Sequence, residues 1–163
     1  MRDFLRINLF WMLTAFCGGV LIDPVLEIRG IAPDFSVISL VVLALAAGSY
    51  PATVGGFFLG LVLDLANPSL LGTQALINSL LGYGLGRLRE RLAHGMPLVE
   101  ATVVILAVLV HDLVFLLVRS ATGDEPFLLL FFTRSVPVAL YSGLVAVPVL
   151  RLAVWFGLLY RED

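Results

Sequence analysis

Residues 98–118 read LVEATVVILAVLVHDLVFLLV, an almost continuous apolar run whose charged members are Glu100 and Asp112. A helix that crosses about 30 Å of hydrocarbon needs roughly 20 predominantly apolar residues. This stretch meets that requirement, so it predicts a transmembrane helix.

The whole chain shares this apolar character. Of its 163 residues, 60% are hydrophobic and 13% are charged, and the mean hydropathy is +1.05. An average soluble domain is about 45–50% apolar and about 25% charged, and a chain of this size cannot hide the excess from water. The net charge of −2, without a basic face, excludes nucleic acid as a partner. We therefore expect an integral membrane protein whose solvent is the lipid bilayer.

Breaks at Pro, Gly and charged residues divide the chain into six apolar runs: residues 4–22, 35–47, 52–66, 71–86, 98–118 and 127–160. The second, third and fourth are short and rich in small residues, which favours burial against neighbouring helices. The last contains Pro137 and Pro148, and is either one broken helix or a span with a surface-lying tail. The predicted fold class is all-α, with six transmembrane helices in a single domain over residues 1–163.

The first run follows Arg2 and Arg6 and so resembles a secretory signal. No small-residue cleavage site precedes Asp23, and Phe16 stands where a lipoprotein signal needs a small residue before Cys17. We interpret this run as an uncleaved transmembrane helix. A single cysteine forms no internal disulfide, and Cys17 lacks neighbouring zinc ligands.

Arginine positions predict the orientation, because cytoplasmic loops carry an excess of positive charge. With six crossings, Arg29 and Arg119 lie on one side and Arg134 falls within the last run. The other seven lie on or near the opposite side: Arg2, Arg6, Arg87, Arg89, Arg91, Arg151 and Arg161. Both termini are therefore predicted to be cytoplasmic.

Two pairs of glycines, Gly56 with Gly60 and Gly82 with Gly86, are each spaced four residues apart. Residues at this spacing share one helical face and allow another backbone to approach closely. We favour packing within the chain over a dimer interface. Leucine at position 60 or 82 should then lower the yield of folded protein.

Polar residues in the apolar runs are the candidate site. Asp64 is either a proton or ion site or, as we favour, a structural group that binds backbone N–H groups freed where Asn67 and Pro68 break the helix. Counting about 1.5 Å per residue predicts one polar layer or pocket, with Gln74 close by, formed by Asp64, Asn78, His111, Asp112 and Arg134. In this layer we expect Arg134 to pair with Asp64 or Asp112; the alternative is that it reaches outward to the headgroups.

Arrangements typical of catalysis are missing from the sequence. His111 and Asp112 are adjacent, and adjacent helical residues point about 100° apart, so their position does not predict a dyad. The chain contains no G-x-S-x-G, H-E-x-x-H or P-loop motif. We expect no catalytic residues, no metal site and no cofactor.

Three stretches carry a family resemblance: PDF at residues 33–35, GFFLGLVLDLANPSLLG at 56–72 and GYGLGRLR at 82–89. Their order resembles the rod shape-determining protein MreD family, in which P-D-F or P-D-L precedes G-F-x-x-G-L-x-x-D, a Pro, L-G and G-Y-x-x-G-R-L. The resemblance spans roughly residues 31–92. The matching residues include Pro33, Asp34, Asp64, Pro68, Gly72, Gly82, Tyr83, Gly86 and Arg87.

The resemblance implies a non-enzymatic scaffold of side-wall peptidoglycan synthesis in the bacterial inner membrane. Its implied partners are the bitopic protein MreC, the MreB filament, the glycosyltransferase RodA and a class B penicillin-binding transpeptidase. The implied fold is similar to the S components of energy-coupling-factor transporters. This similarity leaves an alternative, a substrate-binding subunit of a vitamin transporter, because fold does not fix function.

Overall fold

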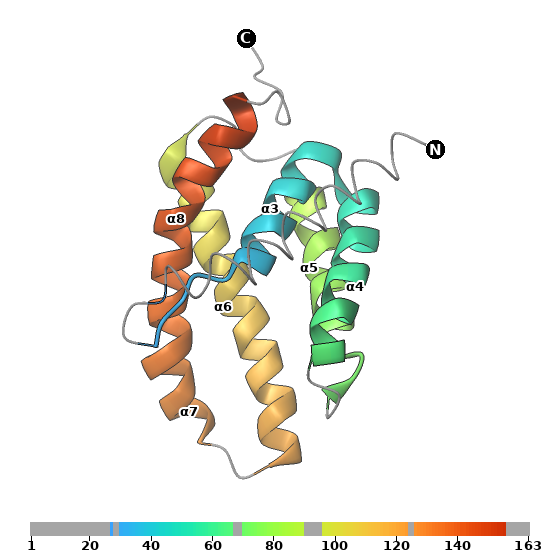
Figure 1. Cartoon of the computed structure of the whole chain (residues 1–163), viewed down its shortest axis with the longest axis vertical. Helices are drawn as coiled ribbons and strands as arrows, with labels where there is room; N and C mark the ends of the chain where they lie inside the picture. Colours follow the sequence, from blue (N-terminus) through green and yellow to red (C-terminus); the bar gives the residue numbers. More distant parts are fainter. Residues whose placement is uncertain (1–26, 28–29, 67–69, 90–95, 124–125, 156–163) are drawn as a thin grey trace.

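The computed structural model describes residue 27 and residues 30–66, 70–89, 96–123 and 126–155. The elements of this part are helical (Figure 1). They are α3 (Phe35–Ala47), α4 (Ser49–Ala66), α5 (Thr73–Leu88), α6 (Pro97–Thr122), α7 (Phe127–Leu130), η4 (Phe131–Ser135) and α8 (Val136–Trp155). The first predicted helix, residues 4–22, lies outside the described residues.

Helix α3 has the predicted bounds because local signals fix both of its ends. At its start, Asp34 Oδ1 accepts a hydrogen bond from the Val37 N–H at 3.0 Å, as an N-cap residue does. At its end, Gly48 adopts a φ of +86°, and its N–H donates to the Ala44 carbonyl. Glycine tolerates this left-handed backbone, so the chain turns there and α4 begins at the next residue.

The last described segment is helical from Phe127 to Trp155, but its hydrogen-bond pattern changes at η4, a π-helical turn. This turn ends one residue before the start of α8, whose second residue is Pro137. Proline has no N–H to donate to the preceding turn, and π-helical turns shift the bonding by one residue. The segment is therefore one irregular helix as far as residue 155, and it continues through Pro148.

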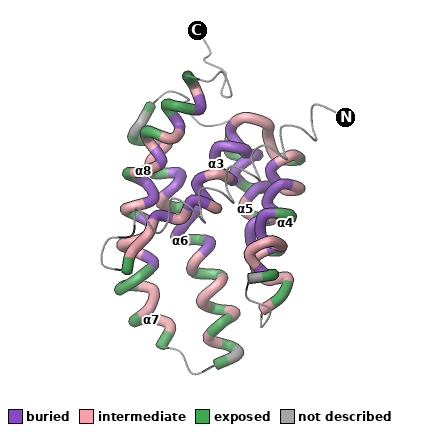
Figure 2. The backbone as a smooth tube through the Cα atoms, viewed as in Figure 1, coloured by how far each residue is buried: buried purple, intermediate pink, exposed green. Residues whose placement is uncertain are grey.

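Helix α3 forms the centre of the described bundle. Figure 1 shows α4 and α5 on one side of it and α6 and α8 on the other, and α3 contacts all four of these helices. Figure 2 shows that α3 is buried along most of its length. Helices that are apolar all round are typically buried. The core consists mainly of α3 aliphatic side chains packed against α6 and α8.

Two described helices are long and apolar enough to cross a bilayer, Leu98–Ala121 and Phe127–Trp155. At about 1.5 Å per residue, their 24 and 29 residues exceed the hydrocarbon thickness of about 30 Å. Phe35–Ala47 and Ser49–Leu65 are apolar but shorter. The structure thus agrees with an all-helical membrane protein, and the count of six spans stays a prediction.

Candidate functional site

Asp64, near the end of α4, binds the beginning of α5. Its Oδ2 accepts hydrogen bonds from the N–H groups of Gly72 (2.9 Å) and Ala75 (3.0 Å), and its Oδ1 accepts one from the Gln74 N–H (3.0 Å). Only 2% of the residue is exposed. Three otherwise unpaired donors at a helix N-terminus thus have a buried carboxylate as their acceptor. This is the structural role favoured from the sequence.

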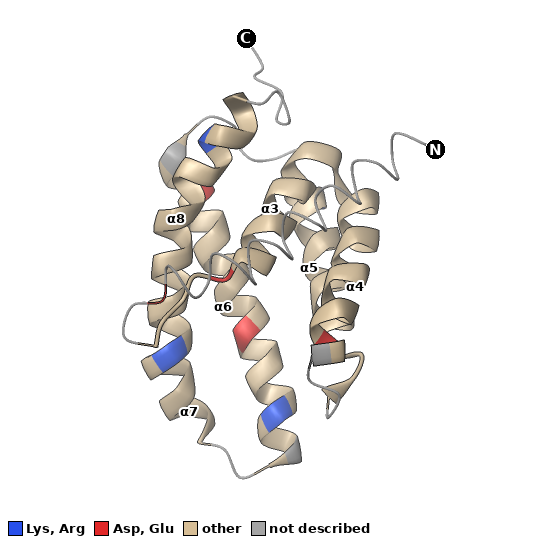
Figure 3. Ribbon diagram, in the orientation of Figure 1, with Lys and Arg blue, Asp and Glu red and all other residues tan. Residues whose placement is uncertain are grey.

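Arg134 is exposed on η4, and the described residues include no ion pair between it and Asp64 or Asp112. The predicted pairing is therefore wrong for this structure. The prediction assumed that each buried acid needs a cationic partner. Asp64 instead has three backbone donors, and Asp112 lies beside His111. Charged side chains are sparse along the described helices (Figure 3).

A polar cluster does form around His111 of α6. The His111 Nδ1 atom lies 3.2 Å from Asp112 Oδ1 and 3.9 Å from Asp34 Oδ2. The His111 Nε2 atom lies 2.8 Å from the side-chain oxygen of Gln74, in the first turn of α5. We call Asp34, His111 and Asp112 the Asp–His–Asp cluster. It joins the start of α3 to α6 and, through Gln74, to α5.

The contact between His111 and Asp112 differs from the expectation based on helical geometry. Their Cα–Cβ bonds diverge by about 100°, yet their polar tips meet at 3.2 Å. Each side chain has two rotatable bonds, and both turn toward Asp34 at the start of α3. Asp34 is distant from His111 in the sequence, so the spacing of His111 and Asp112 could not reveal the cluster.

Asp34 was recognised only as part of the P-D-F motif. Its N–H donates to the Ser142 hydroxyl of α8 at 2.8 Å. Its Oδ1 accepts from the Ser36 hydroxyl (2.6 Å) and the Val37 N–H (3.0 Å). Asp34 is thereby held between α3 and α8, and its Oδ2 points to His111. It was missed because it precedes an apolar run instead of interrupting one.

Asn78, the remaining member of the predicted layer, is fully buried on α5, one turn beyond Gln74. In the described part of the protein, neither of its amide atoms has a hydrogen-bond partner. No hydrogen bond therefore links Asn78 to the Asp–His–Asp cluster. Of the five predicted residues, His111 and Asp112 are in contact. Gln74, which was predicted close by, connects them to Asp64, because its N–H donates to Asp64 Oδ1 and its side-chain oxygen lies 2.8 Å from His111 Nε2.

The four glycines predicted to pack lie between α4 and α5. A methyl group added to any of them would overlap backbone atoms of the opposite helix or the residue before it. The overlapped residues are Asn78 for Gly56, Gln74 for Gly60, Ala52 for Gly82 and Ser49 for Gly86. The close approach is within one chain, as the sequence predicted. Gly84, on the same helix, would meet nothing within 4 Å.

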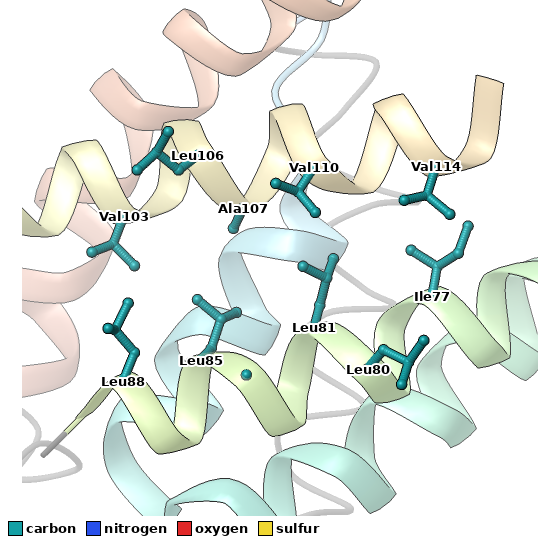
Figure 4. Close-up of a pocket in the computed structure, with 11 residues that line it drawn as sticks. Ile77, Leu80, Leu81, Leu85, Leu88, Val103, Leu106, Ala107, Val110 and Val114 are labelled. Carbon is teal, nitrogen blue, oxygen red and sulfur yellow. The ribbon is translucent and has the colours of Figure 1, made fainter. Parts of the chain in front are cut away.

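An apolar groove of about 410 Å³ lies between α5 and α6 (Figure 4). We call it the α5–α6 groove. It is lined by Ile77, Leu80, Leu81, Gly84, Leu85 and Leu88 of α5 and by Val103, Leu106, Ala107, Val110 and Val114 of α6. The lining side chains carry only carbon, so the groove suits an apolar helix or lipid and gives a polar ligand nothing to bind.

A family model, rod shape-determining protein MreD, matches residues 2–162, nearly the whole chain. The chain belongs to the MreD family. Comparisons with curated proteins and with solved structures gave no match. Membership identifies the chain as a membrane protein with a role in rod-shape determination, in a family that is not a known enzyme family.

Several MreD motif residues have visible structural roles. Pro33 is buried ahead of α3, and Asp64 and Gly72 bond to each other across the turn between α4 and α5. Tyr83 and Arg87 are exposed one turn apart on α5, where the Arg87 Nη2 donates to the Tyr83 hydroxyl at 3.0 Å. Pro68 lies outside the described residues. The motif therefore mainly fixes the α4–α5 hairpin.

Proposed function

We propose that this protein is a non-catalytic scaffold of the cell-elongation machinery and that it binds the single transmembrane helix of a MreC-like protein. Family membership supports the process, side-wall growth in rod-shaped cells. The α5–α6 groove supports the mode of binding, because it is wholly apolar and lies along two helices. The groove is the observation that carries the partner proposal.

The shape of the groove suits an incoming helix. Gly84 and Ala107 contribute almost no side chain, whereas Leu80 and Leu106 stand exposed beside them. In a bilayer, helices associate through close packing over small residues, since lipid supplies little hydrophobic drive. An apolar ridge on a bitopic partner would fill the space between α5 and α6.

For the architecture, we propose six spans in one domain in the bacterial inner membrane, with both termini in the cytoplasm. The arginine distribution supports this orientation. The compact bundle would be similar to the S components of energy-coupling-factor transporters. Bound MreC would connect the scaffold to MreB, RodA and a class B penicillin-binding transpeptidase, and this role involves no catalytic cofactor.

Depletion of the protein in its host tests the proposed function. We expect rods to become spheres within a few generations and the wild-type gene to restore rod width. Added vitamins should have no effect, because the proposed role involves no transport. Retention of rod shape after depletion, or restoration of rods by a supplied vitamin, would contradict the proposal.

A further inference from the structure

We propose that the Asp–His–Asp cluster is a binding site for a divalent transition-metal ion, with Zn²⁺ as the best-matched probe. The donor set is one imidazole nitrogen and two carboxylate oxygens, from Asp34, His111 and Asp112. Zinc commonly takes such mixed nitrogen and oxygen ligands, whereas Mg²⁺ and Ca²⁺ prefer oxygen alone. This site is independent of the α5–α6 groove and of the proposed scaffold function.

The three donor atoms already lie near the spacing that an ion requires. They are all within 4.8 Å of one another. Around a tetrahedral Zn²⁺ with bonds of about 2.0–2.2 Å, donors lie roughly 3.3–3.6 Å apart. The two distances from His111 Nδ1 to the carboxylates, 3.2 and 3.9 Å, bracket this range. Small side-chain adjustments would complete the geometry.

Hydrogen bonds orient two of the proposed ligands, His111 and Asp34, through the atoms that would not bind the ion. The Gln74 Oε1 can only accept, so the His111 Nε2–H donates to it. Histidine ligands characteristically donate their second ring N–H in this way. Nδ1 faces Asp112 Oδ1, and an ion bound at Nδ1 would take the place of a proton between these two atoms. In Asp34, Oδ1 is occupied by Ser36 and Val37, which leaves Oδ2 for the ion.

Charge gives an independent reason for a cation. The Asp34 and Asp112 carboxylates both face His111 Nδ1, at 3.9 and 3.2 Å. His111 is the ion-pair partner of both acids. Two carboxylates share one imidazole, which carries at most one positive charge, and excess charge in the interior of a membrane protein is costly. A divalent ion would neutralise both acids at once.

The cluster is enclosed yet accessible. The His111 side chain is 5% exposed, whereas those of Asp34 and Asp112 are 20% and 22% exposed. The aspartates thus give an ion a route of entry and leave a fourth position for water. A bound ion would tie the start of α3 to the middle of α6, and we expect it to stabilise the core.

Metal binding is measured on full-length protein in nanodiscs, purified with a tag that contains no histidine and treated with EDTA. After addition of ZnCl₂ and gel filtration, we expect one Zn²⁺ per chain and a higher midpoint of thermal unfolding. Asp112→Asn and His111→Asn should each weaken Zn²⁺ binding at least about tenfold, and Gln74→Leu should weaken it by losing the orienting bond.

Matched controls keep the result specific. Glu100→Gln removes an acid of the same helix that pairs with Arg151, and His94→Asn removes the other histidine of the chain. Neither should change the affinity. X-ray absorption of the wild-type complex tests the site even if the ligand variants fail to fold, and should show one nitrogen with oxygen ligands. Substoichiometric zinc, equal affinity in ligand and control variants, or a sulfur ligand would each overturn the proposal.

Discussion

At the residue scale, the buried carboxylate of Asp64 has a structural role, although burying an acid costs free energy. An acid in an apolar run suggests an ion or proton site, but three backbone N–H groups of the α5 N-terminus occupy its carboxylate. The motif spacing from Asp64 to Gly72 thus encodes one hydrogen bond across a turn. Gly72 makes the turn possible because its φ of +94° is a left-handed conformation.

The role of Asp64 predicts a large effect on stability. Asp64→Ala should lower the free energy of unfolding by about 3 kcal/mol, because buried N–H groups lose their acceptor and each costs about 1–3 kcal/mol. Thr102→Ala, at an exposed position of α6, should change it by less than about 0.5 kcal/mol. Reversible unfolding in mixed micelles measures both. Equal stability of the two variants would show that the cap is unimportant.

Residue-level prediction succeeded where the partner was local. The helix break at Asn67–Pro68 indicated that unpaired backbone N–H groups lie near Asp64. The glycine spacing indicated that a second helix backbone packs closely against these glycines. It failed where the partner was distant in sequence. The Asp–His–Asp cluster depends on Asp34 meeting α6. The Arg134 pairing was inferred from equal depth in the bilayer, which does not specify which side chains meet.

At the element scale, the α4–α5 hairpin is the most extensively packed pair of described helices. The two helices approach closely because glycines four residues apart lie on one face of each helix, and this spacing can be read from the sequence. The π-helical turn η4 was not, because Pro137 signals a disturbed helix without specifying how the bonding adjusts.

Two glycines of α5 provide a matched test of this packing. Gly82→Leu should reduce the yield of monodisperse protein sharply, because the side chain would overlap the Ala52 carbonyl. Gly84→Leu should leave the yield near that of wild type, since it points into open space. Size-exclusion profiles in detergent compare them. Equal yields would mean that α4 and α5 need no close contact at position 82.

At the scale of the whole molecule, α6 is long enough to connect the two faces of a membrane. Its 26 residues extend about 39 Å, enough to cross the hydrocarbon. Arg89 precedes this helix and Gly123 follows it, so the two positions should lie on opposite sides.

Cysteine labelling tests the orientation in a Cys17→Ser background. A cysteine at position 123 should react with an impermeant maleimide added to intact cells, and one at position 89 should react only after the membrane is opened. The arginine distribution predicts this direction. Labelling of position 89 from outside would reverse the assignment.

The central claim is that the α5–α6 groove receives the transmembrane helix of a MreC-like partner. Photocross-linking in the host measures this most directly, with benzoylphenylalanine at Leu80 or Leu106 in the groove and at the equally apolar, exposed Leu144 of α8 as control. We predict a cross-link to MreC from both groove positions, none from position 144, and loss of the cross-link when Gly84→Leu fills the groove without disturbing the fold. Cross-linking to MreC from position 144 alone, or unchanged cross-linking in the Gly84→Leu variant, would contradict the account.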